Sequence, residues 1–100
     1  MISHVVLFKL KDFENEDQKA VVRNKIKHAL LSLNGKIKEL KFIEVGQNHQ
    51  LNSVSYDLCL ITHFDTLADL ATYQVHPEHL KVVDLIKSNT TDRAVVDFEF

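Results

Sequence analysis

The order in which hydrophobic periodicity changes along the chain is the strongest constraint on its fold. Apolar residues alternate as in a strand over residues 2–10, 39–46, 55–64 and 93–100. Between the first and second of these segments, and again between the third and fourth, the spacing changes to that of an amphipathic helix. The order β-α-β-β-α-β predicts an α+β, ferredoxin-like fold, with a four-stranded antiparallel sheet that carries its helices on one face.

Capping residues mark the ends of the first helical segment. Asn15 can cap its start, with Gln18 three residues later to complete a capping box. Gly35 is suited to end it, because glycine adopts the left-handed conformation that often closes a helix. A polar loop is predicted from Gln47 to Ser53.

A proline divides the second helical segment. Asp65 or Thr66 can cap its start. Pro77 pushes the residue before it out of the helical region, so the helix should end near Val75. Because proline is favoured in a first helical turn, a new helix should begin at Pro77.

Length and charge limit the possible classes of protein. The chain of 100 residues is 45% hydrophobic and 26% charged, which predicts a single globular domain over residues 1–100. A net charge of -2 without a basic patch argues against nucleic-acid binding. No apolar run is long enough to span a bilayer, and the start of the chain does not resemble a secretory signal. The lone Cys59 predicts a reducing compartment, so we expect a cytoplasmic protein.

Two helical regions can cover only one face of the predicted sheet. We expect the more aromatic set of side chains to lie beneath the helices: Val6, Phe8, Leu10, Phe42, Leu58, Leu60, Val96 and Phe98. The other face would then expose a second apolar set: Val5, Leu7, Ile43, Val45, Cys59, Ile61 and Val95. A homodimer packed through this second face is the simplest way to cover it. The alternative is a solvated face with scattered apolar residues.

The stretch around Pro77 carries the best candidates for chemistry. The break in the helix allows Tyr73 and His79 to turn toward one cavity. His79 lies in the first turn of the new helix, where the positive end of the helix disfavours imidazolium and leaves a neutral general base. Tyr73 could donate a hydrogen bond to a substrate oxygen. In the alternative interpretation, His76 only caps a helix and His79 is a surface or packing residue.

The first strand and its neighbours are predicted to form the rest of this cavity. His4 shares a face with Val6 and should lie at the far wall, opposite His76 and His79. The remaining lining is expected to be apolar, from Val6, Phe8, Leu58, Val96 and Phe98. Three histidines could bind a metal, but no acidic or supporting partner is identifiable, so no metal is predicted.

Several motifs together resemble the stress-responsive A/B barrel (Dabb) family. The resemblance covers nearly the whole chain. It rests on residues 2–11, on Gly35, on Glu44-Val45-Gly46-Gln47-Asn48, on Tyr56-Asp57-Leu58, on Tyr73-Gln74-Val75-His76-Pro77-Glu78-His79-Leu80 and on residues 93–99. It implies a dimeric α+β barrel.

The resemblance also suggests an activity. Plant polyketide cyclases of the family close a linear polyketide by aldol chemistry, and their catalytic tyrosine and histidine match Tyr73 and His79, while their first-strand histidine matches His4. A further pocket histidine of those cyclases falls at Leu58 in this chain. The aromatic residues of their first helix are replaced by Val21, Val22 and Lys25.

Two functions therefore remain open. The first is a small homodimer whose apolar pocket binds a small apolar or aromatic carbonyl compound and performs cofactor-free lyase or cyclase chemistry. The second is a non-catalytic, stress-associated binding or structural dimer. No cofactor motif is present: the chain has neither a glycine-rich phosphate loop nor a cysteine pair.

Overall fold

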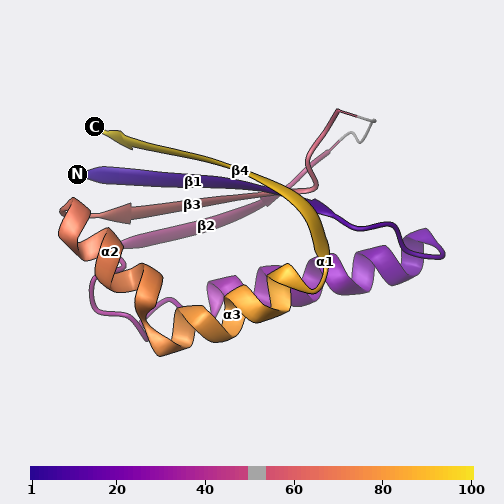
Figure 1. The fold of residues 1–100 in the computed structure, drawn as a ribbon, viewed down its shortest axis with the longest axis horizontal. Helices are drawn as coiled ribbons and strands as arrows, with labels where there is room; N and C mark the ends of the chain where they lie inside the picture. The colour runs from indigo at the N-terminus through magenta and orange to yellow at the C-terminus, as the bar shows by residue number, and fades with distance from the viewer. Residues whose placement is uncertain (50–53) are drawn as a thin grey trace.

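The computed structural model describes residues 1–49 and 54–100, and it has the predicted ferredoxin-like α+β arrangement. The antiparallel sheet has the order β2-β3-β1-β4, and all three helices lie on one side of it (Figure 1). The strands are β1 (Ile2–Leu10), β2 (Phe42–Gln47), β3 (Leu58–Phe64) and β4 (Thr90–Glu99). The helices are α1 (Glu16–Leu31), α2 (Leu67–Val75) and α3 (Pro77–Lys87).

The first helix begins as predicted and ends earlier than predicted. The Asn15 side chain accepts a hydrogen bond from the backbone N–H of Gln18 at 2.9 Å, which caps α1. Helix α1 ends at Leu31 with Ser32 as its C-terminal cap. Gly35 has a φ of 84°, so glycine is needed there, but it lies in the turns after the helix and does not cap it.

The second crossover is broken at the predicted proline. The Thr66 side chain caps α2 by accepting a hydrogen bond from Asp69 N–H at 3.1 Å. His76 then has an extended backbone, with φ -64° and ψ 136°, and α3 begins at Pro77. The break therefore changes the direction of the chain between two helices that would otherwise form one continuous helix.

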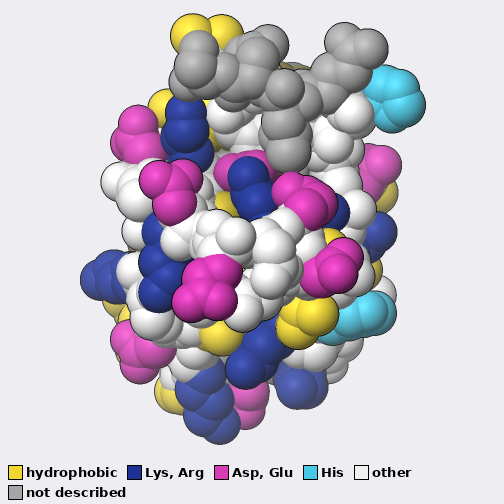
Figure 2. All heavy atoms as spheres, turned by 90° about the vertical axis from the view of Figure 1, so that its right-hand side faces the viewer, with side chains coloured by type: hydrophobic (Ala, Val, Ile, Leu, Met, Phe, Trp, Pro, Cys, Tyr) yellow, Lys and Arg dark blue, Asp and Glu magenta, His cyan; other side chains and the backbone are white. Residues whose placement is uncertain are grey.

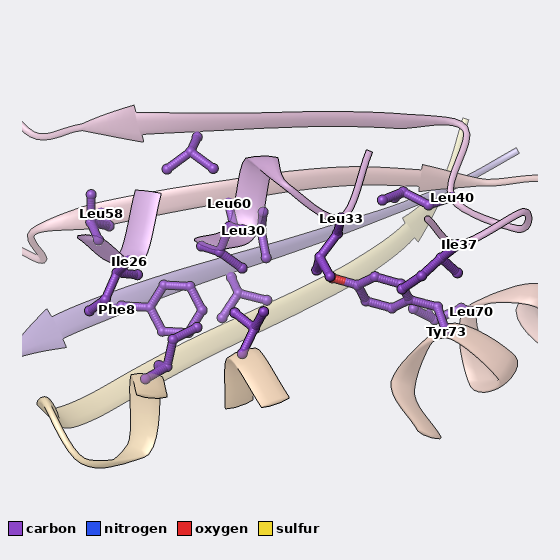
Figure 3. Packing of buried hydrophobic residues seen from close by; sticks show 14 of the residues in the cluster. Phe8, Ile26, Leu30, Leu33, Ile37, Leu40, Leu58, Leu60, Leu70 and Tyr73 are labelled. Carbon is purple, nitrogen blue, oxygen red and sulfur yellow. The ribbon is translucent and has the colours of Figure 1, made fainter. Parts of the chain in front are cut away.

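The two central strands place their apolar sides as predicted. On β1 the buried residues include Val6 and Phe8, and on β3 they include Leu58 and Leu60. These side chains pack against α1 through Ile26 and Leu30, and Figure 3 shows this layer between sheet and helices. The helix-covered face of the sheet is thus the core of the domain.

The edge strands are reversed relative to the prediction. Val45 pairs with Leu60 and is buried toward the helices, whereas Phe42 pairs with His63 on the open face.

The same reversal occurs on β4. Val96 pairs with Val5, and Phe98 pairs with Ser3, so both lie on the open face and are 60% and 48% exposed. The predicted helix-facing positions of Phe42, Val96 and Phe98, and the open-face positions of Ile43, Val45 and Val95, were therefore wrong. The residues on the helix side of β4 include Arg93, Val95, Asp97 and Glu99.

The surface seen in Figure 2, at the right-hand end of Figure 1, carries Lys and Arg side chains interspersed with Asp and Glu.

Gln47, the first residue of the predicted loop, ends β2, and residues 50–53 of that loop lie outside the described residues. Within residues 1–49 and 54–100, no helix combines the length and apolar character needed to cross a membrane.

Candidate active site

A cavity of about 250 Å³ lies between the helix-covered face of the sheet and the helices. Strand β1, strand β3 and helices α1 and α3 supply its apolar wall, which consists of Val6, Phe8, Leu30, Leu60, Val83 and Ile86. Its remaining lining residues are polar: His4, Gln74, His79, Lys87, Thr90 and Arg93. An apolar cavity with a few polar groups is the usual form of a small-molecule site.

The helix break positions His79 at this cavity. In an unbroken helix, the backbone N–H of Glu78 would bond to the carbonyl of Gln74. Instead, Glu78 N–H donates to His76 Nδ1 at 3.1 Å, which caps α3. The Gln74 carbonyl is thereby released, and His79 Nδ1 lies 3.0 Å from its oxygen.

This hydrogen bond determines which nitrogen of His79 can act as a base. A carbonyl oxygen only accepts hydrogen bonds, so Nδ1 of His79 carries the hydrogen and donates it to Gln74. In the neutral ring, Nε2 then holds the free lone pair. Burial lowers the pKa of His79 from its ordinary 6.5, and the charges of His4, Arg93 and His76 lower it further. The bond to Gln74 opposes that shift but does not reverse it.

His4 is the second imidazole at the cavity, and Asp97 holds it. His4 is 5% exposed on β1, and its Nδ1 donates to the Asp97 carboxylate on the neighbouring strand β4. This pair exists because Asp97 is opposite His4 in the strand register. Sequence reasoning missed Asp97 because the assignment of Val95 to the open face also put Asp97, two residues further on, on that face. The strand pairing was the missing signal.

Tyr73 contacts His79 through its ring and does not line the cavity. The two ring centroids are 4.3 Å apart at an interplanar angle of 42°. The side chain is fully buried, and its hydroxyl points into the core on the side of Leu33 (Figure 3). That hydroxyl has no hydrogen-bond partner among the described residues, and burial raises its pKa.

The other predicted pocket residues lie elsewhere. His76 uses Nδ1 to cap α3, in agreement with the alternative interpretation of this residue. Leu58 is buried in the core and lines a different hollow, and Val96 and Phe98 belong to the opposite face of the sheet. Of the predicted set, His4, Val6, Phe8 and His79 are brought together.

A second hollow, of about 320 Å³, lies near Leu7 and Cys59, both of which face the open side of the sheet. Burial and the nearby Glu44 raise the pKa of Cys59, which makes its thiol a poor nucleophile. The Tyr56 hydroxyl at this hollow donates to Asp92 at 3.2 Å. The helix-side cavity, with its two oriented imidazoles, is therefore the better candidate for catalysis.

The residues that the structure describes contain no cluster of three His, Cys, Asp or Glu side chains able to hold a metal ion. His76, which with His4 and His79 would complete a three-histidine set, has its Nδ1 engaged by the backbone of Glu78.

Comparison with known proteins gives consistent matches over the full length. The model of the Stress responsive A/B Barrel Domain family matches residues 2–100. An uncharacterised protein of Streptomyces coelicolor is 33% identical over 100 residues, which covers the whole of both chains.

Solved structures agree with this match. A dimeric protein of unknown function with a ferredoxin-like fold from Bacteroides fragilis is 37% identical, with a TM-score of 0.88 over 99% of this chain and 95% of that one. A dimeric ferredoxin-like protein from Thermobifida fusca is 29% identical, with a TM-score of 0.82 over 99% of this chain and 90% of that one.

Proposed function

Since the chain belongs to the stress-responsive A/B barrel domain family, we propose that it is a homodimer in which each cavity binds a small carbonyl compound and transfers protons on it. His79 is the general base, and the reaction uses no cofactor. The observation that carries this proposal is the orientation of His79, whose Nδ1 is held by the Gln74 carbonyl at the edge of an apolar cavity.

The proposed step is enolisation. Nε2 of His79 takes a proton from the carbon next to the carbonyl group, the electron pair of the broken C–H bond forms a C=C bond, and the π pair of the carbonyl group moves onto its oxygen. The same imidazole then returns the proton to carbon, or the enolate carbon attacks a second carbonyl, as in an aldol cyclisation, and the alkoxide formed there takes the proton from His79. His4, held through Nδ1 by Asp97, is the second group at this cavity able to exchange a proton with the ligand.

Tyr73 supports this step as a positioning residue. Its ring lies against the His79 ring, with centroids 4.3 Å apart, and so limits the orientations of the imidazole. Its hydroxyl is directed away from the cavity lining, so the proposed step does not use it.

The dimer is proposed to form through the open face of the sheet. That face carries Val5 and Ile61 at its centre, with Val96 60% exposed beside them. Burying such a surface against its own copy removes apolar area from water. The Bacteroides fragilis and Thermobifida fusca proteins with the same fold are dimeric.

A non-catalytic binding dimer is the second candidate, and the position of the Tyr73 hydroxyl favours it. In the cyclase-like interpretation, a tyrosine and a histidine act together on the ligand. Here the hydroxyl is buried in the core, on the side of Leu33 (Figure 3). A pocket that only binds its ligand needs no such hydroxyl.

Hydrogen–deuterium exchange on phenylacetone separates the two candidates. The α-hydrogens of this ketone exchange slowly in D₂O near neutral pH, and proton NMR follows their loss. We expect the protein to accelerate exchange, and we expect His79→Gln to lower that acceleration by a factor on the order of 10² or more, as for loss of a general base.

His28→Gln is the matched control, because His28 is an exposed imidazole on α1. It should leave the exchange rate unchanged. Equal loss in both variants, or no acceleration by the wild-type protein while phenylacetone still binds, would reject the catalytic proposal. The second of these results would support the binding dimer.

A further inference from the structure

The polar lining of the helix-side cavity has an unbalanced charge. Arg93 from β4 and Lys87 from the last turn of α3 both line it, whereas no Asp or Glu does. Within residues 1–49 and 54–100, neither cation forms an ion pair with a carboxylate. The cavity lining therefore carries two positive charges and no acidic side chain that balances them.

The nearest carboxylates along the same strand have other partners. Asp97 faces the helices as Arg93 does, but it is four residues away along β4, about 13 Å in an extended strand, and it accepts from His4. Asp92 accepts from the backbone N–H of Arg93 and from the Tyr56 hydroxyl, and its partner in the register is Lys9. Neither carboxylate neutralises the guanidinium at the cavity.

Arg93 also lies next to the apolar wall and near the proposed base. The strand register places it opposite Phe8, and both residues line the cavity. Its positive charge is close enough to His79 to help lower the pKa of that imidazole. A ligand whose anionic group binds Arg93 would therefore have its apolar part against this wall, within reach of His79.

We infer that Arg93, assisted by Lys87, binds the carboxylate of an otherwise apolar carbonyl compound in this cavity, so that the ligands are oxo acids. This inference rests on the proposed function for the carbonyl group, but the carboxylate subsite is testable by binding alone. Arginine suits this role because its planar guanidinium can pair with a carboxylate through two parallel hydrogen bonds. Lys87 adds a point charge on a flexible chain.

A pair of probes with the same shape tests the subsite. Phenylacetate and phenylacetamide differ in charge but hardly in size, and their affinities can be measured by NMR titration of the isotope-labelled protein. Because a hydrogen bond to a charged group is stronger than one to a neutral group, phenylacetate should bind about tenfold tighter or more. Because Arg93 and Lys87 are both exposed to solvent, the preference should decrease as salt is added.

Variants assign the preference to its residues. Arg93→Gln should reduce the affinity for phenylacetate about tenfold and leave that for phenylacetamide unchanged. Lys87→Gln should have a smaller effect of about twofold, since a flexible ammonium group does not form the two parallel hydrogen bonds that a guanidinium can form with a carboxylate. Lys38→Gln is the matched control for the loss of one positive charge, because the Lys38 side chain is 90% exposed in the segment after α1.

Equal binding of the two probes, binding of neither, or a preference for phenylacetate that survives Arg93→Gln would overturn the carboxylate subsite. These outcomes are distinct from failure of the proposed function, which is judged by exchange on the uncharged ketone phenylacetone. Exchange that depends on His79 without carboxylate selectivity would leave the base in place and remove only the oxo-acid assignment. Selective binding without exchange would leave a binding protein for carboxylates.

Discussion

The two faces of the sheet are built from similar side chains but present different chemistry. The helix-covered face combines a buried apolar wall with His4, His79 and a cavity of about 250 Å³. On the open face, Phe42, Val96 and Phe98 remain 41–60% exposed. Burial beneath the helices lowers the pKa of His79, whereas the uncovered face offers apolar area to a partner.

A row of aromatic rings lies along one margin of the open face. The rings of Phe42 and His63 stack with centroids 4.6 Å apart, and the ring of Phe100 lies 4.7 Å from His63 on the other side. This row crosses from β2 to the end of β4. It borders the aliphatic centre around Val5 and Ile61, so the surface proposed for the dimer has an apolar centre and an aromatic margin.

The largest expected effect comes from placing a charge at the centre of the open face. Ile61→Asp should convert the dimer to a monomer at micromolar concentration, because the dimer would bury an unpaired carboxylate. Sedimentation velocity measures the change. Val21→Asp on α1 is the control, since Val21 is 67% exposed on the helical layer, and it should stay dimeric.

A dimer that persists in Ile61→Asp would place the interface elsewhere. A wild-type chain that sediments as a monomer would contradict the proposal that the open face forms a dimer interface. The far-ultraviolet circular dichroism of both variants should match that of the wild type, which separates loss of the dimer from loss of the fold.

The central and edge strands show how far the sequence could predict these faces. On β1 and β3 both phases of the alternation are apolar, but the phase with Phe8 and Leu58 is the one beneath the helices, as predicted, and each strand has neighbours on both sides that fix its register. On β4, Val95 and Val96 are adjacent, so both phases of the alternation are apolar. Assigning the more aromatic phase to the helices was wrong there, because the open face is at least as aromatic as the covered one.

The candidate site, like the sheet, could be predicted only in part. Pro77 is a local signal, and the break that positions His79 could be predicted from it. Arg93 reaches the cavity, and Asp97 reaches His4, only through the strand register, which depends on contacts distant in the sequence. The direction of the Tyr73 hydroxyl depends on packing in the core, which no spacing of residues encodes.

A smaller effect is expected in the pH dependence of the covered face. Because the pKa of His79 is lowered from 6.5, the acid limb of the phenylacetone exchange rate should have its midpoint below that pH. Arg93→Gln should move the midpoint upward, since it removes one of the positive charges that lower the pKa. The exchange rate measured from pH 4 to 8 tests both shifts.

The same shift should appear in stability, with a defined sign. The unfolded chain binds a proton at His79 near its ordinary pKa, and the folded chain binds it only at lower pH. The contribution of His79 is therefore complete above pH 6.5 and is lost as the pH falls from there to the lowered folded value. His79→Gln should remove this part of the pH dependence, and an unchanged profile would contradict the lowered pKa.

The smallest expected effect concerns the hydroxyl of Tyr73, which is buried on the covered face. Because this group has no hydrogen-bond partner among the described residues, Tyr73→Phe should leave the free energy of unfolding unchanged or raise it by up to about 1 kcal/mol. Tyr56→Phe is the matched control, which should lower it slightly because the Tyr56 hydroxyl donates to Asp92. Urea unfolding at equal protein concentration measures both. The ring against His79 is kept in Tyr73→Phe, so phenylacetone exchange should stay within about twofold of the wild type, whereas a loss on the order of 10² would make the hydroxyl a catalytic donor.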